Sequence, residues 1–194
     1  TDPVGFSWYH SLQTRVQRRY AKGVILLATY TWAKNMEATT FLNEYDAMPE
    51  HVISDLDRAH RFAGSGIWEL PIGRGKAFGR KMNRWLNAVA GGWQYQAIYQ
   101  RQVGAPVAFP DLPYFGDFSK ISLPASDRTL TRWFNTDGFI LTAAQQLDWN
   151  VRRFPSRLAG LRNPGDDWWD MSMMKSFVVT ERIRLQLRTN WEGA

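Results

Sequence analysis

A few groups of residues in the sequence have types and spacing that could carry chemistry. Asp55 and Asp57 bring two carboxylates close to the imidazole of His60, and Glu50 and His51 lie shortly before them. Such groups can bind a cation or share a proton. Their spacing matches no known metal-binding loop. We therefore expect a solvated loop that leads into a strand, and we predict no catalytic residue, no metal site and no cofactor here.

A second group, Gly73, Arg74, Gly75 and Lys76, superficially resembles a phosphate-binding loop. It lacks the GxxxxGK[ST] spacing with which backbone amides surround a phosphate, so we interpret it as a turn that needs glycine dihedral angles. Cysteine is absent, which excludes disulfides, thiolate zinc sites and cysteine nucleophiles. No serine lies at a strand-to-helix elbow of the kind that serine hydrolases use. The sequence therefore predicts that the protein is not an enzyme.

Composition further narrows the classes of protein to which the chain can belong. The chain has 194 residues, of which 44% are hydrophobic, enough for a domain with a core. Its formal net charge of +6 raises the question of a polyanionic partner such as nucleic acid or lipopolysaccharide. The basic residues alternate with aromatic ones along predicted strands and form no RNA-recognition motif, so we expect no nucleic-acid partner. Aromatic residues are abundant, with 10 Trp, 7 Tyr and 11 Phe.

Alternation of polar and apolar residues is the main structural signal. Ile183, Leu185 and Leu187 are predicted to face one side of a strand, and Arg184 and Gln186 the other. The predicted strands lie near residues 8–20, 24–34, 60–70, 93–102, 169–179 and 182–191. Their lengths approach the roughly 9 to 11 residues that a tilted transmembrane strand needs, whereas no apolar run reaches the roughly 18 of a membrane helix.

The connections between these strands are unequal. Long irregular loops are predicted at residues 35–59 and 103–168, and short turns at the other strand ends. A transmembrane barrel has this arrangement, with tight turns inside and long loops outside. The segment 71–92 is long although it falls on the short-turn side. Within it Met82, Trp85, Leu86 and Val89 have helical spacing, and this helix could pack on protein or lie at a membrane interface.

We therefore predict an all-β fold: one partial domain, residues 1–194, that is an antiparallel up-and-down segment of a transmembrane β-barrel and is incomplete by itself. Gln and Arg on the polar faces are typical of a hydrated lumen. The residues predicted to face the lumen are Gln94, Gln96, Gln100, Arg184, Gln186 and Arg188. Those predicted to face lipid or to form an aromatic girdle are Trp32, Trp68, Trp93, Tyr95, Leu185, Leu187 and Trp191. Aromatic residues that fill a soluble sandwich core would give the same period, so this alternative stays open.

Particular strings add to this pattern. The relevant ones are WYHSLQTRVQRRYAKGVILLATYTWAKNM (8–36), DRAHRFAGSGIWELPIGRGKAF (57–78), NAVAGGWQYQAIYQRQVGAPV (87–107), RWFNTDGF (132–139), LRNPGDDWWDMSMMKSF (161–177) and ERIRLQLRTNW (181–191). Together they resemble the barrel of Oar-like TonB-dependent receptors. These are outer-membrane proteins of acidobacteria that often carry a carboxypeptidase-regulatory-like domain. The resemblance covers nearly the whole chain, in order.

The resemblance implies location in the cell outer membrane and uptake of a ligand through a plugged β-barrel. It implies as partners the outer-membrane lipid, the remainder of the barrel and plug of a parent protein, the TonB energy-coupling protein, and a transported ligand of unknown identity. It also implies a plug and further strands that this sequence does not contain, so we expect a fragment from the carboxyl-terminal part of the barrel. The alternative is a soluble, basic, Trp-rich β-domain that binds carbohydrate.

Overall fold

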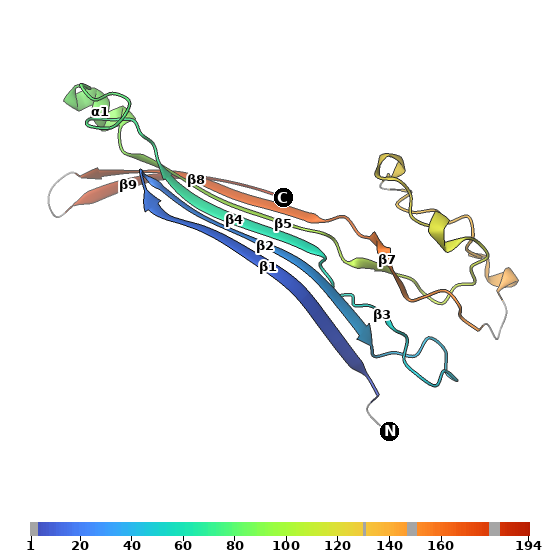
Figure 1. Ribbon diagram of the computed structural model, residues 1–194. Coiled ribbons are helices and arrows are strands. Elements are labelled where there is room, and N and C mark those ends of the chain that lie inside the picture. The colour runs from blue at the N-terminus through green and yellow to red at the C-terminus, as the bar shows by residue number, and fades with distance from the viewer. Residues whose placement is uncertain (1–3, 130, 147–150, 179–182) are drawn as a thin grey trace. The chain divides into compact units, whose positions relative to one another are not determined.

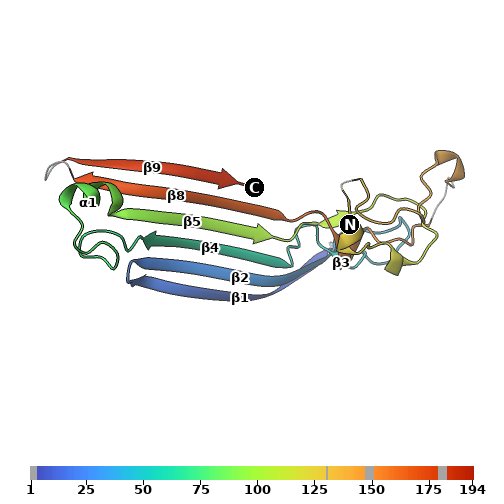
Figure 2. The ribbon, with the colours of Figure 1, turned by 90° about the horizontal axis from the view of Figure 1, so that it is seen from above.

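The protein is built around an antiparallel meander of long strands (Figure 1), and the computed structural model describes residues 4–129, 131–146, 151–178 and 183–194. The long strands are β1 (Phe6–Ala21), β2 (Val24–Ala38), β4 (His60–Glu69), β5 (Trp93–Gln102), β8 (Asp166–Val178) and β9 (Arg184–Gly193). They lie side by side in the order β1-β2-β4-β5-β8-β9, as Figure 2 shows. Neighbours in the sheet therefore follow one another along the chain, apart from short strands in the connections.

The chain divides into two compact units. A sheet unit contains Leu12–Trp32, His60–Gln102 and Asp166–Ala194, and a loop unit contains Thr1–Ser11, Ala33–Ala59 and Val103–Gly165. The boundary between the units falls inside β1 and β2. The prediction of one partial barrel domain over residues 1–194 therefore stays a prediction.

The sheet unit has a regular ladder of hydrogen bonds because its residues favour strands and because the turn between β1 and β2 has the conformation of a hairpin. Lys22 and Gly23 link β1 to β2 with φ angles of 53° and 81°, which are the positive values of a type I′ hairpin turn. From there β2 pairs with β4 without interruption from Val24 opposite Trp68 to Trp32 opposite His60. The turn predicted between the last two strands, and the predicted strand ends Val179 and Arg182, lie outside the described residues.

The loop unit is more ordered than the irregular loops that the sequence predicts. It contains the strands β3 (Val52–Ile53), β6 (Pro106–Ala108) and β7 (Arg157–Arg162) and the short 3₁₀ helices η1 (Phe118–Lys120), η2 (Ala125–Asp127) and η3 (Ala143–Gln145). Its buried core consists of Phe109, Ile121, Phe154 and Leu161. The ring of Phe109 stacks on that of Phe139 with centroids 5.7 Å apart. These residues are far apart in sequence and have no common period, so a pattern search could not group them.

Strand and helix bounds also differ in places from the sequence prediction. β2 continues past residue 34 to Ala38, because its end pairs with β3 through Met36 opposite Ile53. The helix α1 (Arg84–Ala90) lies in the segment 71–92, and Asn83 caps it by accepting a hydrogen bond from the amide of Leu86 at 2.7 Å. Among the described residues, no helix is long and apolar enough to cross a bilayer. The predicted all-β antiparallel fold class is confirmed, and the described strands do not close into a barrel.

Candidate functional site

The register of the sheet assigns each side chain to one of two faces, because directly opposed residues point to the same side. Gln96 of β5 is opposite Ser172 of β8, and Ser172 is opposite Asn190 of β9. We call the side that carries these residues the polar face. It holds all six residues that the sequence predicts to face a lumen, namely Gln94, Gln96, Gln100, Arg184, Gln186 and Arg188.

The opposite side, which we call the aromatic face, carries Tyr95 opposite Trp68. It holds all seven residues predicted to face lipid, namely Trp32, Trp68, Trp93, Tyr95, Leu185, Leu187 and Trp191. Trp68 remains 45% exposed and Leu185 60% exposed. Within the described residues these large apolar groups have no second layer over them, which does not fit the core of a soluble sandwich.

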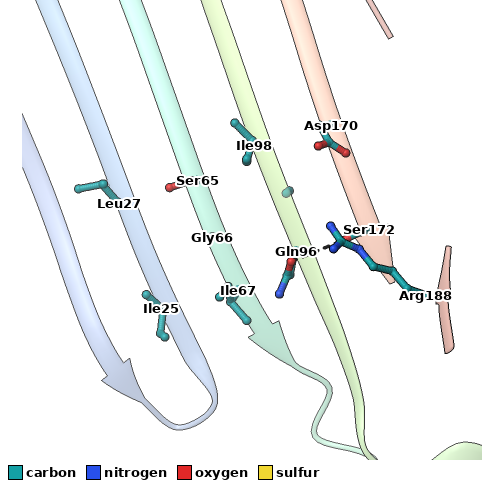
Figure 3. Close-up of a pocket in the computed structure, with 11 residues that line it drawn as sticks. Ile25, Leu27, Ser65, Gly66, Ile67, Gln96, Ile98, Asp170, Ser172 and Arg188 are labelled. Atoms are coloured by element: carbon teal, nitrogen blue, oxygen red, sulfur yellow. Dashed lines mark hydrogen bonds between the residues drawn. The ribbon is translucent and has the colours of Figure 1, made fainter. Parts of the chain in front are cut away.

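A shallow pocket of about 250 Å³ lies in the polar face (Figure 3). Gln96, Ser172 and Arg188 contribute polar atoms to it, and the Ser172 hydroxyl donates a hydrogen bond to Oε1 of Gln96 at 3.4 Å. Toward β2 and β4 the same pocket is lined by apolar side chains such as Ile25 and Leu27. The polar face is therefore hydrophilic over β5, β8 and β9 and partly apolar over β2 and β4, a gradient that the sequence alternation alone did not indicate.

Lys175 is a buried charged residue on the aromatic face. Its residue is only 3% exposed, and its ammonium donates hydrogen bonds to the carbonyl oxygens of Val89 at 2.7 Å and Gly91 at 2.6 Å. It also lies 5.3 Å from the ring centroid of Trp93 and 5.0 Å from that of Phe177. Carbonyl groups at the end of a helix carry partial negative charge, so they compensate for the desolvation of this cation.

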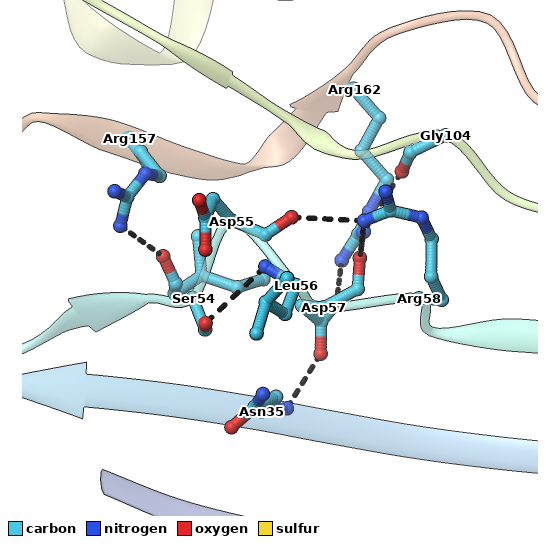
Figure 4. Close-up of polar contacts among 10 residues, drawn as sticks. Asn35, Ser54, Asp55, Leu56, Asp57, Arg58, Gly104, Arg157 and Arg162 are labelled. Atoms are coloured by element: carbon cyan, nitrogen blue, oxygen red, sulfur yellow. Dashed lines mark hydrogen bonds and ion pairs between the residues drawn. The ribbon is translucent and has the colours of Figure 1, made fainter.

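A buried ionic network joins distant segments of the loop unit (Figure 4). Asp57 is 1% exposed, pairs with Arg162 at 2.5 Å and accepts a hydrogen bond from the amide of Asn35. Arg162 also donates to the carbonyl oxygen of Gly104 at 3.3 Å. The expectation of a solvated loop is therefore wrong for Asp57, because a guanidinium from β7 neutralises its buried carboxylate. Asp55 and Leu56 are exposed, and the loop leads into β4 at His60 as predicted.

Close approach of the backbone and a second ion pair complete this network. A Cβ atom at Gly104 would collide with the carbonyl oxygens of Asn163 and Pro164, so only glycine fits there. Arg157 of β7 pairs with Glu37 of β2 at 2.6 Å, and both side chains are more than four-fifths buried. The predicted connections 35–59 and 103–168 are thus held to each other by charged groups of opposite sign.

The loop unit also has a surface pocket of about 250 Å³, lined by aromatic residues and Arg153. Tyr114 lines this pocket, and its phenol donates a hydrogen bond to the carbonyl oxygen of Asp117 at 3.0 Å. Burial and the Asp117 carboxylate raise the pKa of Tyr114, so the phenol stays protonated at neutral pH. The Ser119 hydroxyl and amide donate to Asp117 and lower the pKa of its carboxyl group.

Comparison with known proteins identifies the family of the chain. The family model of the outer membrane beta barrel domain matches residues 1–191. The chain belongs to this family. The searches of curated proteins and of solved structures gave no match.

This outer membrane β-barrel domain is located in the outer membrane. That location removes support from the alternative of a soluble carbohydrate-binding domain. Which face of the sheet meets lipid and which meets water stays a prediction. The burial of Glu37, Arg157, Arg162 and Lys175 was not predicted from the sequence. Only Lys175 left a signal, since it interrupts the apolar alternation between Met171 and Phe177.

The two faces can be compared at adjacent methionines of β8. Met173 lies on the aromatic face opposite Tyr95, and Met174 lies on the polar face opposite Gln94. In the full-length protein refolded into lipid vesicles, Met173→Arg should lower the free energy of unfolding by about 2–4 kcal/mol, because a cation would enter hydrocarbon. Met174→Arg should cost at most about 1 kcal/mol, through repulsion from Arg188 across the strand pair. Urea titrations measure both, and equal costs would contradict the assignment of the faces.

The buried ion pair between Asp57 and Arg162 in the loop unit can also be tested. Arg162→Met leaves the Asp57 carboxylate buried without its partner, which should destabilise the loop unit by about 3–5 kcal/mol. Breaking the exposed pair between Arg101 and Asp167 with Arg101→Met should cost less than about 1 kcal/mol. Hydrogen exchange at Val52 and Ile53 reports on the loop unit. Unchanged exchange in Arg162→Met would show that the pair does not hold the loops together.

Proposed function

We propose that the chain is a wall segment of a TonB-dependent receptor, which takes up a ligand through a plugged barrel of the outer membrane. The observation that carries the proposal is that the amide and guanidinium groups of β5 and β9, apart from Arg101, lie on one face of the sheet. Exposed aromatic and aliphatic groups such as Trp68 and Leu185 lie on the other face. A barrel with a hydrated lumen needs this separation along every strand. In this proposal the protein does no covalent chemistry.

The open edges of the sheet support a large barrel. In the part of the chain that the structure describes, β1 and β9 each pair with a neighbour on one side only. In hydrocarbon, unpaired backbone N–H and C=O groups cost several kcal/mol each, so both edges need further strands. Six strands closed on themselves would be narrower than the smallest eight-stranded barrels, whose interior side chains already fill. Arg184, Gln186 and Arg188 are too bulky for such an interior.

The resemblance to Oar-like receptors supports the energy-coupled part of the proposal. In the whole receptor, the rest of the barrel and a plug would complete the wall, and the TonB protein would supply the energy for opening. The polar face would line the path of the ligand. The loop unit would lie on the outer side, where its aromatic pocket at Tyr114 and Arg153 is a suitable first contact for a ligand.

The first test concerns the edges. The isolated 194-residue chain, refolded in detergent, should aggregate or pair edge to edge, because its edge strands have no partners. It should give no heat-resistant monomer in semi-native electrophoresis, whereas the full-length protein should give one under the same conditions. A monodisperse, protease-resistant monomer of the isolated chain would show that it is not a piece of a larger barrel.

The second test concerns the plug and the lumen. The full-length protein should pass little current in a planar bilayer, and deletion of its plug domain should open a large pore. In the open pore Arg188→Gln should shift the reversal potential toward cation selectivity, because a lumen charge is lost. The matched variant Arg101→Gln removes an exposed charge from the aromatic face and should leave selectivity unchanged. A full-length protein without a plug, or equal shifts in the two variants, would overturn the proposal.

A further inference from the structure

The short helix α1 exposes its apolar residues instead of burying them. Trp85 is 83% exposed, Leu86 53% and Val89 70%, and the helix has no buried residue. Their positions i, i+1 and i+4 place these three side chains on one side of the helix. A helix that packed on protein or capped the end of a barrel would bury this side. The exposed stripe therefore needs an apolar partner outside the chain.

The structure fixes where this stripe lies. Lys175 holds the carbonyl groups of Val89 and Gly91, and the indole N–H of Trp93 donates to the Val89 carbonyl oxygen at 3.0 Å. Both Lys175 and Trp93 belong to the aromatic face. Figures 1 and 2 show α1 beside the ends of β5 and β8, on the side of the short turns. The exposed stripe therefore continues the aromatic face at its short-turn end.

All the charged residues of the segment that contains α1 are basic. The segment 71–92 contains five basic residues, Arg74, Lys76, Arg80, Lys81 and Arg84, and no acidic residue. Lys76 pairs with Glu69 at 3.4 Å, while Arg80, Lys81 and Arg84 are exposed. An apolar stripe next to a cluster of cations is the pattern with which amphipathic helices bind anionic membrane surfaces.

We propose that α1 is a membrane-surface anchor. Trp85, Leu86 and Val89 insert at the boundary of the acyl chains in the leaflet at the short-turn end, and the exposed basic residues bind anionic phospholipid headgroups there. Lys175 fixes the depth of the helix, because it ties the end of α1 to the lipid-facing strands. This inference rests on the proposed orientation of the aromatic face toward lipid.

The experiment uses fluorophores at single cysteines in the full-length protein. This chain has no cysteine of its own, so Leu86→Cys can be labelled once any cysteine elsewhere in the full-length protein is replaced. Ala88→Cys, roughly 200° around α1 from Leu86, is the matched control, and Leu187→Cys on the aromatic face is the reference. The vesicles contain phosphatidylethanolamine and phosphatidylglycerol, with a nitroxide quencher near the top of the acyl chains.

The label at Leu86 should lose most of its emission, and the label at Ala88 should keep most of it. Replacing Arg80, Lys81 and Arg84 by Gln should weaken the quenching at Leu86 in these vesicles to the level found in phosphatidylcholine vesicles. Quenching at Leu187 without quenching at Leu86 would overturn the anchor and leave the barrel wall intact. The absence of quenching at both sites would overturn the orientation of the aromatic face, and equal quenching at Leu86 and Ala88 would show that α1 has no preferred side toward lipid.

Discussion

Backbone hydrogen bonding is the constraint on which this structure depends. In hydrocarbon no water pairs with a free N–H or C=O group, so a chain that crosses the outer membrane with strands must pair each strand on both sides. Within the described residues β2, β4, β5 and β8 meet this requirement. The ladders from β2 to β9 run without a shift in register. Because the register is continuous, alternation is preserved across the sheet. Over β5, β8 and β9 one face then collects most of the Gln and Arg residues, and the other face collects most of the Trp, Tyr and Leu residues.

The loop unit is stabilised in a different way. Its core is a small aromatic cluster around Phe109 and Phe154, and its connections are joined by ion pairs from Asp57 to Arg162 and from Glu37 to Arg157. Burial of such charges is tolerable only when the partner and additional hydrogen bonds are present. Both arginines lie on β7, so this one short strand orders segments that are more than a hundred residues apart in the chain.

On the aromatic face, the buried charge of Lys175 is likewise compensated by its neighbours. A lysine in the middle of an apolar stripe would be costly in lipid, yet here its ammonium is covered by two carbonyl groups and two rings. Lys175 therefore positions α1 and does not serve to expose a charge to water. It attaches α1 to the end of the strands that carry the aromatic face, which a solvent-exposed lysine could not do.

The sequence by itself determined the class of fold, the approximate positions of the long strands and the sorting of side chains between two faces. It could do so because alternation is a local property, with a period of two residues that needs no knowledge of the partner strand. For the same reason it indicated the helix between β4 and β5. Only the tertiary structure decided that Asp57 is buried against Arg162, that Phe109 and Phe154 form a core, and that Lys175 holds α1. These contacts join residues about 45 to 105 positions apart and follow no period, so their energies depend on a geometry that no local pattern encodes.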